Sequence, residues 1–148
     1  MRVTRRDFAV AAIAAGVSLS AAALAQGAPA ILGPMVWDWN TLEARKTDVG
    51  ELRNVVRQPT ATLSELEIHV TTLNPGIASH PPHHHPNEEI VIVRTGTVEV
   101  LSGGMWKRLG PGSIIFNASN SEHALKNVGT SPATYDVINW KTPATPAN

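Results

Sequence analysis

The chain has 148 residues, which is enough for one globular domain and hardly enough for two. Its 12 Lys and Arg residues balance its 12 Asp and Glu residues, so the formal net charge is zero and no basic, nucleic-acid-binding face is indicated. There is no cysteine, which excludes disulfides, thiolate metal sites, iron–sulfur clusters and cysteine nucleophiles.

The first 25 residues have the three-part layout of an export signal peptide. Arginines precede an alanine-rich apolar run at 8–24, and the run ends in a small-x-small pattern at 23–25. Residues 4–8, Thr-Arg-Arg-Asp-Phe, also resemble a twin-arginine translocation signal. A spanning helix is the alternative, but it needs about 20 strongly apolar residues and this run is shorter. We therefore expect removal of residues 1–25, no stable membrane span in the mature form, and a periplasmic or secreted location.

Residues 26–45 are expected to form an extended N-terminal segment ahead of the globular domain. Residues 26–36 are rich in Ala, Gly and Pro and predict a flexible lead-in. Trp37 and Trp39 stand two residues apart, so both rings share one face if the segment is extended. They could cover an outer face of the domain, form an interface with a second copy, or pack as ordinary core residues.

From residue 50 onward, the sequence predicts short β-strands. Residues 66–70 alternate apolar and polar side chains, which indicates a half-buried strand with His69 on its polar, surface-facing side. Further strands are expected at 89–93, 98–101, 106–109, 113–116, 123–128 and 133–140. Many short strands with Gly- and Pro-containing turns predict an all-β sandwich or barrel over residues 46–141. The tail at 142–148 contains two prolines and is expected to be flexible.

Histidines cluster in one short stretch: of the six in the chain, four lie at positions 80, 83, 84 and 85. Imidazole is a common neutral metal ligand near physiological pH. In an extended segment His83 and His85 point to the same face and form a candidate ligand pair, whereas His84 points away. We interpret His80 and His84 as solvated loop residues or as groups that support the ligands.

Two carboxylates and one more histidine are candidates for the remaining ligand positions. Glu89 shares a strand face with valines at 91 and 93, and a buried carboxylate is costly unless it is paired or binds a metal. Glu88 shares its face with two isoleucines, so the pattern alone leaves both carboxylates open. His123 opens a later strand. Three imidazoles and a carboxylate suit one divalent ion of iron, manganese, nickel, cobalt or zinc.

The spacing of these residues resembles the first of the two motifs of the cupin superfamily, G-x5-H-x-H-x3,4-E-x6-G. The positions that match it are His83, His85, Glu89 and Gly96. The initial glycine of the motif stands one residue further upstream than usual, which is a small departure in a loop. The register of the motif favours Glu89 over Glu88 as the carboxylate ligand.

The second motif of the family, G-x5-P-x-G-x2-H-x3-N, is also present in register. Its positions here are Gly112, Ala118, Asn120, His123 and Asn127. Ala118 replaces the proline and Asn120 replaces the second glycine. Because asparagine tolerates positive φ better than most residues, Asn120 is expected to preserve the tight turn.

The resemblance implies a jelly-roll barrel, an antiparallel double-stranded β-helix, that holds one divalent metal ion. The implied ligands are His83, His85, Glu89 and His123. Because barrels of this family frequently pair, a homodimer is also expected. The favoured hypothesis is a dioxygenase-like, quercetinase-like enzyme acting on a small oxygen-rich molecule. A metal-dependent isomerase or epimerase, a non-catalytic small-molecule- or metal-binding barrel, and a barrel braced by a structural metal stay open, and no catalytic acid or base is assigned.

Overall fold

The computed structural model describes residues 29–147, and the regular structure in this range is almost entirely β-strand. In chain order the elements are η1 (Trp39–Thr41), β1 (Arg45–Thr47), β2 (Gly50–Gln58), β3 (Glu65–Leu73), β4 (Glu88–Thr95), β5 (Val98–Ser102), β6 (Met105–Leu109), β7 (Ile114–Asn117), β8 (Ala124–Asn127) and β9 (Ala133–Lys141). The export signal expected at residues 1–25 lies outside the described residues. Within the described range, no helix is long and apolar enough to cross a membrane.

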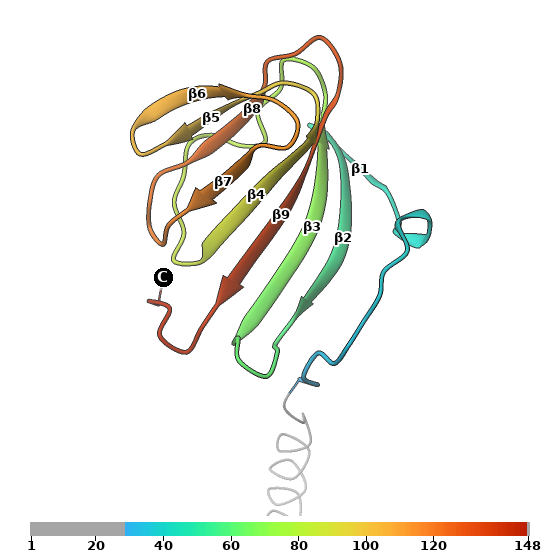
Figure 1. Cartoon of the computed structure of the whole chain (residues 1–148), viewed down its shortest axis with the longest axis vertical. Coiled ribbons are helices and arrows are strands. Elements are labelled where there is room, and N and C mark those ends of the chain that lie inside the picture. Colours follow the sequence, from blue (N-terminus) through green and yellow to red (C-terminus); the bar gives the residue numbers. More distant parts are fainter. Residues whose placement is uncertain (1–28, 148) are drawn as a thin grey trace, which may run out of the picture.

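The strands form two antiparallel sheets around a shared core (Figure 1). The larger sheet has the order β1-β2-β3-β9-β4-β7, and the smaller has the order β6-β5-β8. Successive strands such as β4 and β5, or β8 and β9, belong to different sheets, so the chain crosses between the sheets repeatedly. This is the topology of a jelly-roll barrel. The all-β fold class expected from the sequence is therefore confirmed.

The segment between β3 and β4 extends the smaller sheet without forming a regular strand. It lies antiparallel to β8 through two isolated bridges, Ala78–Lys126 and His83–His123. Five positions separate Ala78 from His83, but three separate His123 from Lys126, so the segment carries two extra residues at this point. The His-Pro-Pro sequence at 80–82 lies in this irregular stretch. The second bridge brings His83 beside the residue that precedes β8.

The apolar core is densest where β3 and β4 end and β9 begins. Leu73, Val93 and Val98 are fully buried there, as is the polar residue Asn127. The Asn127 amide donates hydrogen bonds to the carbonyls of Leu73 (3.1 Å) and Ser131 (2.9 Å), and its oxygen accepts one from a backbone N–H (2.9 Å). A buried polar side chain is tolerated when its hydrogen bonds are made. Asn127 therefore fastens the end of β8 to the end of β3.

Two positions of the sequence motifs have backbone conformations that explain their residue types. Gly96 has φ of 84°, and a Cβ there would lie 2.6 Å from the Cα of Ala133, so only glycine fits. Asn120 has φ of 57°, in the left-handed region that asparagine tolerates. Its N–H donates to the carbonyl of His85 at 2.8 Å. The expectation that Asn120 preserves the tight turn is confirmed, and the turn contacts a predicted metal ligand.

The N-terminal segment packs on the outer face of the larger sheet. Trp37, Trp39 and Leu42 line a shallow pocket with residues of β2, β3 and β9, including Ile68 and Val70. The two tryptophans therefore cover a face of their own barrel, which was one of the alternatives left open by the sequence.

The Trp39 ring is held between two guanidinium groups. Those of Arg53 and Arg94 lie 4.7 and 5.0 Å from its centroid, a cation–π arrangement. Arg53 also donates to the Leu42 carbonyl at 2.7 Å, and Arg94 pairs with Asp136 at 2.7 Å. These contacts tie η1 to β2, β4 and β9.

Candidate metal centre

Two segments that are distant in the sequence bring the three predicted histidine ligands together. His83 and His85 lie between β3 and β4, and His123 directly precedes β8. The backbones of His83 and His123 exchange two hydrogen bonds of 3.1 and 2.9 Å, which places their side chains next to each other. One ring nitrogen from each of the three histidines lies within 4.8 Å of those of the other two. Such a cluster of imidazole nitrogens has the dimensions of a metal site.

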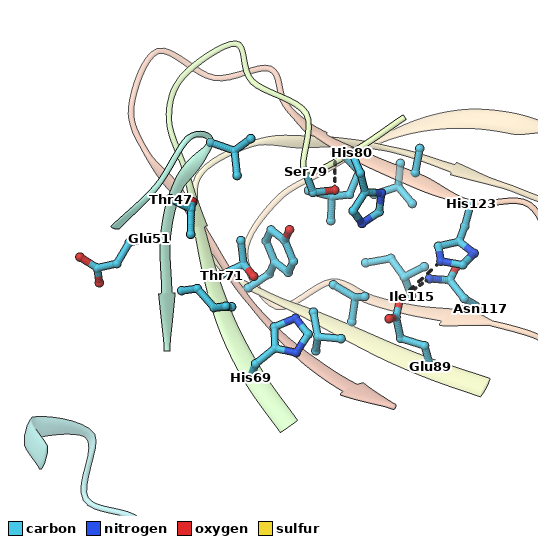
Figure 2. Close-up of a pocket in the computed structure, with 18 residues that line it drawn as sticks. Thr47, Glu51, His69, Thr71, Ser79, His80, Glu89, Ile115, Asn117 and His123 are labelled. Carbon is cyan, nitrogen blue, oxygen red and sulfur yellow. Dashed lines mark hydrogen bonds and ion pairs between the residues drawn. The ribbon is translucent and has the colours of Figure 1, made fainter. Parts of the chain in front are cut away.

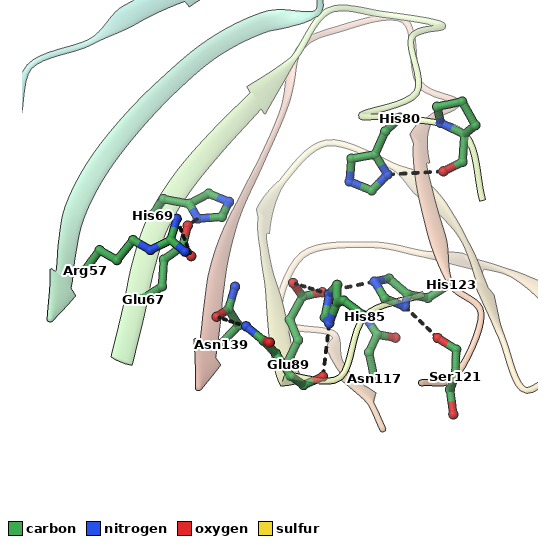
Figure 3. Close-up of polar contacts among 12 residues, drawn as sticks. Arg57, Glu67, His69, His80, His85, Glu89, Asn117, Ser121, His123 and Asn139 are labelled. Carbon is green, nitrogen blue, oxygen red and sulfur yellow. Dashed lines mark hydrogen bonds and ion pairs between the residues drawn. The ribbon is translucent and has the colours of Figure 1, made fainter. Parts of the chain in front are cut away.

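The carboxylate of Glu89 completes this arrangement from β4. Its oxygens lie 3.8 Å from Nε2 of His85 and 3.9 Å from Nε2 of His123. Asn117, the partner of Glu89 on β7, donates its side-chain amide to Oε1 of Glu89 at 2.8 Å. The contacts of Glu89, Asn117, His85 and His123 are shown in Figure 3. Three imidazoles and one oriented carboxylate therefore face the same point.

Hydrogen bonds orient two of the imidazoles. Nδ1 of His85 lies 3.0 Å from the carbonyl of Asn87, and Nδ1 of His123 lies 2.9 Å from the carbonyl of Ser121. A carbonyl only accepts, so Nδ1 of each ring carries the proton and Nε2 keeps its lone pair. This is the arrangement by which proteins orient metal-binding histidines.

Two buried atoms at the centre are free to bind a ligand. Nδ1 of His83 and Nε2 of His123 are buried and have no hydrogen-bond partner among residues 29–147. Leaving buried polar atoms unpaired costs about 1–3 kcal/mol each, so such atoms are rare in a stable fold. A divalent ion bound to these nitrogens would satisfy them. The residues present therefore fit a metal ion of the borderline class.

The surroundings of His83 favour its neutral imidazole, the form that binds metals. Burial, together with the neighbouring His80, His123 and His85, lowers the pKa of His83 to about 4, against the opposing effect of Glu89. Burial is also the main cause of a lowered pKa at His80. His80 lies against the edge of the His83 ring, with a centroid separation of 4.0 Å. The centre is consequently prepared for a cation rather than for protons.

Strand register separates the two carboxylates that the sequence pattern left open. Glu89 lies inside, in line with Val91 and Val93, and close to the histidine cluster. Glu88 lies on the other face, where its Oε2 accepts a hydrogen bond of 3.1 Å from the indole of Trp140. His84 is exposed and lies outside the histidine cluster. The structure thus brings together the four predicted ligands and leaves Glu88 and His84 apart.

A cavity of about 300 Å³ extends from this centre into the barrel (Figure 2). Its apolar walls come from both sheets and include Val91, Val100, Ile115, Leu125 and Val137. Its polar lining, apart from the metal centre, includes His69, Thr71, Ser79, His80 and Tyr135. At roughly 30 Å³ per water molecule, the volume corresponds to about ten water molecules, which suits a small organic molecule.

Tyr135 supplies a buried hydroxyl to this cavity. Burial raises the pKa of Tyr135 to about 12, although hydrogen bonding with Ser79 and Thr71 partly opposes the shift. The phenol is therefore neutral at physiological pH and can both donate and accept a hydrogen bond.

His69 is the residue that the sequence misplaced. The alternation in its strand predicted a surface position, but His69 lines the cavity, whereas Ile68 and Val70 face the N-terminal segment outside. Apolar residues point outward here because Trp37 and Trp39 cover them. Only the density of histidines in the chain could have raised His69 as a candidate.

The comparisons with known proteins agree with this architecture. Residues 69–139 match the family model described as "Cupin domain". No curated protein matches the chain.

Several solved structures share the fold. A Cupin 2 conserved barrel domain protein from Salinispora arenicola has a TM-score of 0.55 and 21% identity, over 78% of this chain and 93% of that one. A sugar phosphate isomerase of the cupin superfamily from Silicibacter pomeroyi has a TM-score of 0.58 and 21% identity, over 74% and 77%. A predicted oxalate decarboxylase from Thermotoga maritima has a TM-score of 0.57 and 16% identity, over 72% and 99%. At these identities the similarity shows the fold alone.

Proposed function

We propose that this chain is a member of the cupin superfamily, whose domain model matches residues 69–139, and that it is an exported metal-dependent enzyme acting on a small oxygen-rich molecule, with dioxygenase-like chemistry as the first candidate. The observation that carries the proposal is the convergence of three histidine nitrogens next to a cavity that His123 and Glu89 line. The proposed ligands are His83, His85, Glu89 and His123.

The chain's own residues account for binding and orientation. Asn117 fixes Glu89, and the carbonyls of Asn87 and Ser121 fix the rings of His85 and His123. A divalent ion held by these groups would supply Lewis-acid or redox chemistry. Apolar side chains from both sheets form much of the cavity wall, and an apolar environment strengthens polar interactions.

The cavity also limits the substrate. Its volume of about 300 Å³ excludes polymers and large cofactors as occupants. The neutral Tyr135 hydroxyl and the hydroxyls of Ser79 and Thr71 offer hydrogen bonds to substrate oxygens. A compact molecule with two neighbouring oxygens for the metal and one further oxygen for this hydroxyl group would match the lining.

Elemental analysis of the purified protein tests the metal site. The chain from residue 26 onward, without an affinity tag, is expected to contain close to one equivalent of iron, manganese, nickel, cobalt or zinc. The double variant His85→Ala/His123→Ala should lose the metal and keep the β-rich circular dichroism spectrum. The matched control is His84→Ala, an exposed histidine of the same stretch, which should keep the metal. A parent protein that takes up none of these ions contradicts the proposal.

Oxygen consumption tests the reaction class. The iron form is mixed with chelating phenols and diketones, and uptake of dioxygen is followed with an electrode. Uptake that disappears in the double variant supports dioxygenase-like chemistry. A stoichiometric, tightly held metal with no exchange of bound water and no turnover would instead favour a binding or structural barrel.

Export and self-association complete the proposal. Replacing Arg5 and Arg6 by Lys should abolish export through the twin-arginine route, and unchanged export would exclude that route.

We expect a homodimer, supported by the exposed Ile114 and Phe116 on β7, which forms the edge of the larger sheet. Light scattering on the purified protein measures this directly, and a monomer at micromolar concentration would contradict it.

A further inference from the structure

We propose that His69 and Glu67 form an acid–base dyad that exchanges a proton with the molecule bound in the cavity. This deepens the proposed function, because it assigns the proton-transfer residue of the same site, and it rests on that function for the identity of the ligand. His69 acts as the catalytic residue and Glu67 as its positioning residue.

The register of the larger sheet places His69 across the cavity from the metal centre. His69 pairs with Val137 on β9, and Val137 pairs with Val91 on β4. Strands are spaced by about 4.8 Å, so the His69 backbone lies about 10 Å across the sheet from that of Val91. Glu89 lies two positions before Val91 on the same inward face. Figure 2 shows the His69 ring and the Glu89 carboxylate directed at the cavity from separate strands.

Glu67 engages one nitrogen of the ring. Its Oε1 lies 3.4 Å from Nδ1 of His69, and its Oε2 lies 3.7 Å from Nη1 of Arg57 (Figure 3). Glu65 fixes the same guanidinium with a 3.0 Å contact and also pairs with Lys141 at 3.4 Å. In the proposed dyad this carboxylate accepts the Nδ1 proton, which leaves Nε2 for the cavity. A histidine oriented by a carboxylate in this manner is suited to general acid–base catalysis.

The proton transfer between the ligand and His69 requires no further reactant. An acidic C–H or O–H bond of the ligand breaks, its electron pair stays on the ligand, and the proton moves to Nε2 of His69. Glu67 stabilises the imidazolium that forms, and the proton later returns to the ligand or to water.

The titratable and charged groups around the dyad come from four strands and the loop before β4. They are Glu65 of β3, Arg57 of β2, Lys141 and Tyr135 of β9, Glu89 of β4, and His80 of the loop.

The tautomer of His69 gives a test that needs neither metal nor ligand. Nitrogen-15 spectra of histidine-labelled full-length protein should show the Nδ1–H tautomer at His69, with the resonance assigned through His69→Gln. Glu67→Gln keeps an acceptor and should keep this tautomer, whereas Glu67→Leu should lose it. An Nε2–H tautomer in the wild type would overturn the dyad.

Proton transfer is tested with 2,4-pentanedione as the probe on the zinc-loaded protein. Stopped-flow ultraviolet absorbance follows the conversion of the diketone to its bound enolate. His69→Gln should slow this step by about 100-fold, because general base catalysis typically contributes 10²–10⁴-fold. Metal content and final absorbance should not change. His84→Gln, an exposed histidine, should react like the wild type.

Two failures can be told apart. Equal rates for wild type and His69→Gln would overturn the proton-transfer role while leaving the metal-dependent function intact. A wild type that binds zinc but never forms the enolate would contradict both the proposed function of the metal centre and the proton-transfer role of His69. The tautomer spectrum would still decide whether the dyad exists.

Discussion

The hydrogen bond from Asn117 to Glu89 should control metal affinity without controlling the fold. Asn117→Leu removes a 2.8 Å contact to a carboxylate in a position that is 4% exposed. Hydrogen bonds to charged groups contribute about 1.5–3 kcal/mol. Loss of a residue that supports a metal ligand typically lowers metal affinity by about 10–100-fold, which corresponds to about 1.4–2.8 kcal/mol. The two independent estimates agree, so a 10–100-fold weaker affinity is expected.

Stability of the metal-free protein should respond differently to the same change. Oδ1 of Asn117 is buried and finds no hydrogen-bond partner within the described part of the chain, which already disfavours the native state. A leucine of similar size would remove this unsatisfied atom, and replacing buried polar groups by apolar ones of similar shape can be nearly neutral. We therefore expect the free energy of unfolding without metal to change by less than about 1 kcal/mol.

Competition with a chromophoric chelator measures the affinity, and urea denaturation of the chelated protein measures the stability. Asn139→Leu is the matched control, because Asn139 flanks Glu89 on the opposite strand and is 8% exposed, but bonds to Asn87. Its metal affinity should stay within about twofold of the parent. Equal losses in the two variants, or no loss in Asn117→Leu, would refute the assignment of Asn117 as the group that orients Glu89.

Three further predictions concern the fold and its pH dependence. Asn127→Ala abolishes three buried hydrogen bonds and should destabilise the protein by about 2–4 kcal/mol in urea denaturation, with an effect below 1 kcal/mol refuting the bracing role. Trp39→Ala removes the ring between Arg53 and Arg94 and should cost about 1–3 kcal/mol while metal content, measured by elemental analysis, stays constant. Because the pKa of His83 is lowered to about 4 in the folded state, the unfolded chain binds more protons between pH 4 and the ordinary histidine value of 6.5. Stability of the chelated protein should therefore fall as pH decreases through this window, and His83→Gln should flatten that part of the pH profile.

The sequence predicted the barrel and the spatial convergence of its histidines because both follow from local rules. Period-2 alternation and Gly- or Pro-containing turns indicated the strands, and the fixed spacing from His83 to Glu89 is set by one loop and one strand. The turn at Asn120 was also predictable, since few residues other than glycine adopt its φ of 57°.

Tertiary contacts decided the features that the sequence left open or misplaced. The apolar alternation alone left Glu88 and Glu89 open, and the hydrogen bond from Trp140 to Glu88 shows that Glu88 lies on the face away from the histidine cluster. The side of β3 was misjudged for a similar reason. The rule that polar residues face solvent fails when a distant segment carrying Trp39 covers the apolar face and the barrel interior contains a polar cavity.

The distribution of polarity along the barrel explains how one small domain can be both stable and functional. Along the larger sheet, the cross-strand pairs that face inward change from apolar to polar. The pair Leu73–Ala133 is apolar and fully buried, whereas the pair Glu67–Asn139 is polar and lies beside Glu89. Burying carboxylates and unpaired imidazoles opposes folding, so these groups are compatible with a stable domain only if a separate apolar region supplies the stability. Here that region lies at the far end of the same strands. The candidate metal centre can therefore keep atoms that a bound ion would satisfy, because its strands are held in register by apolar residues such as Leu73 and Ala133, which lie outside the cavity lining.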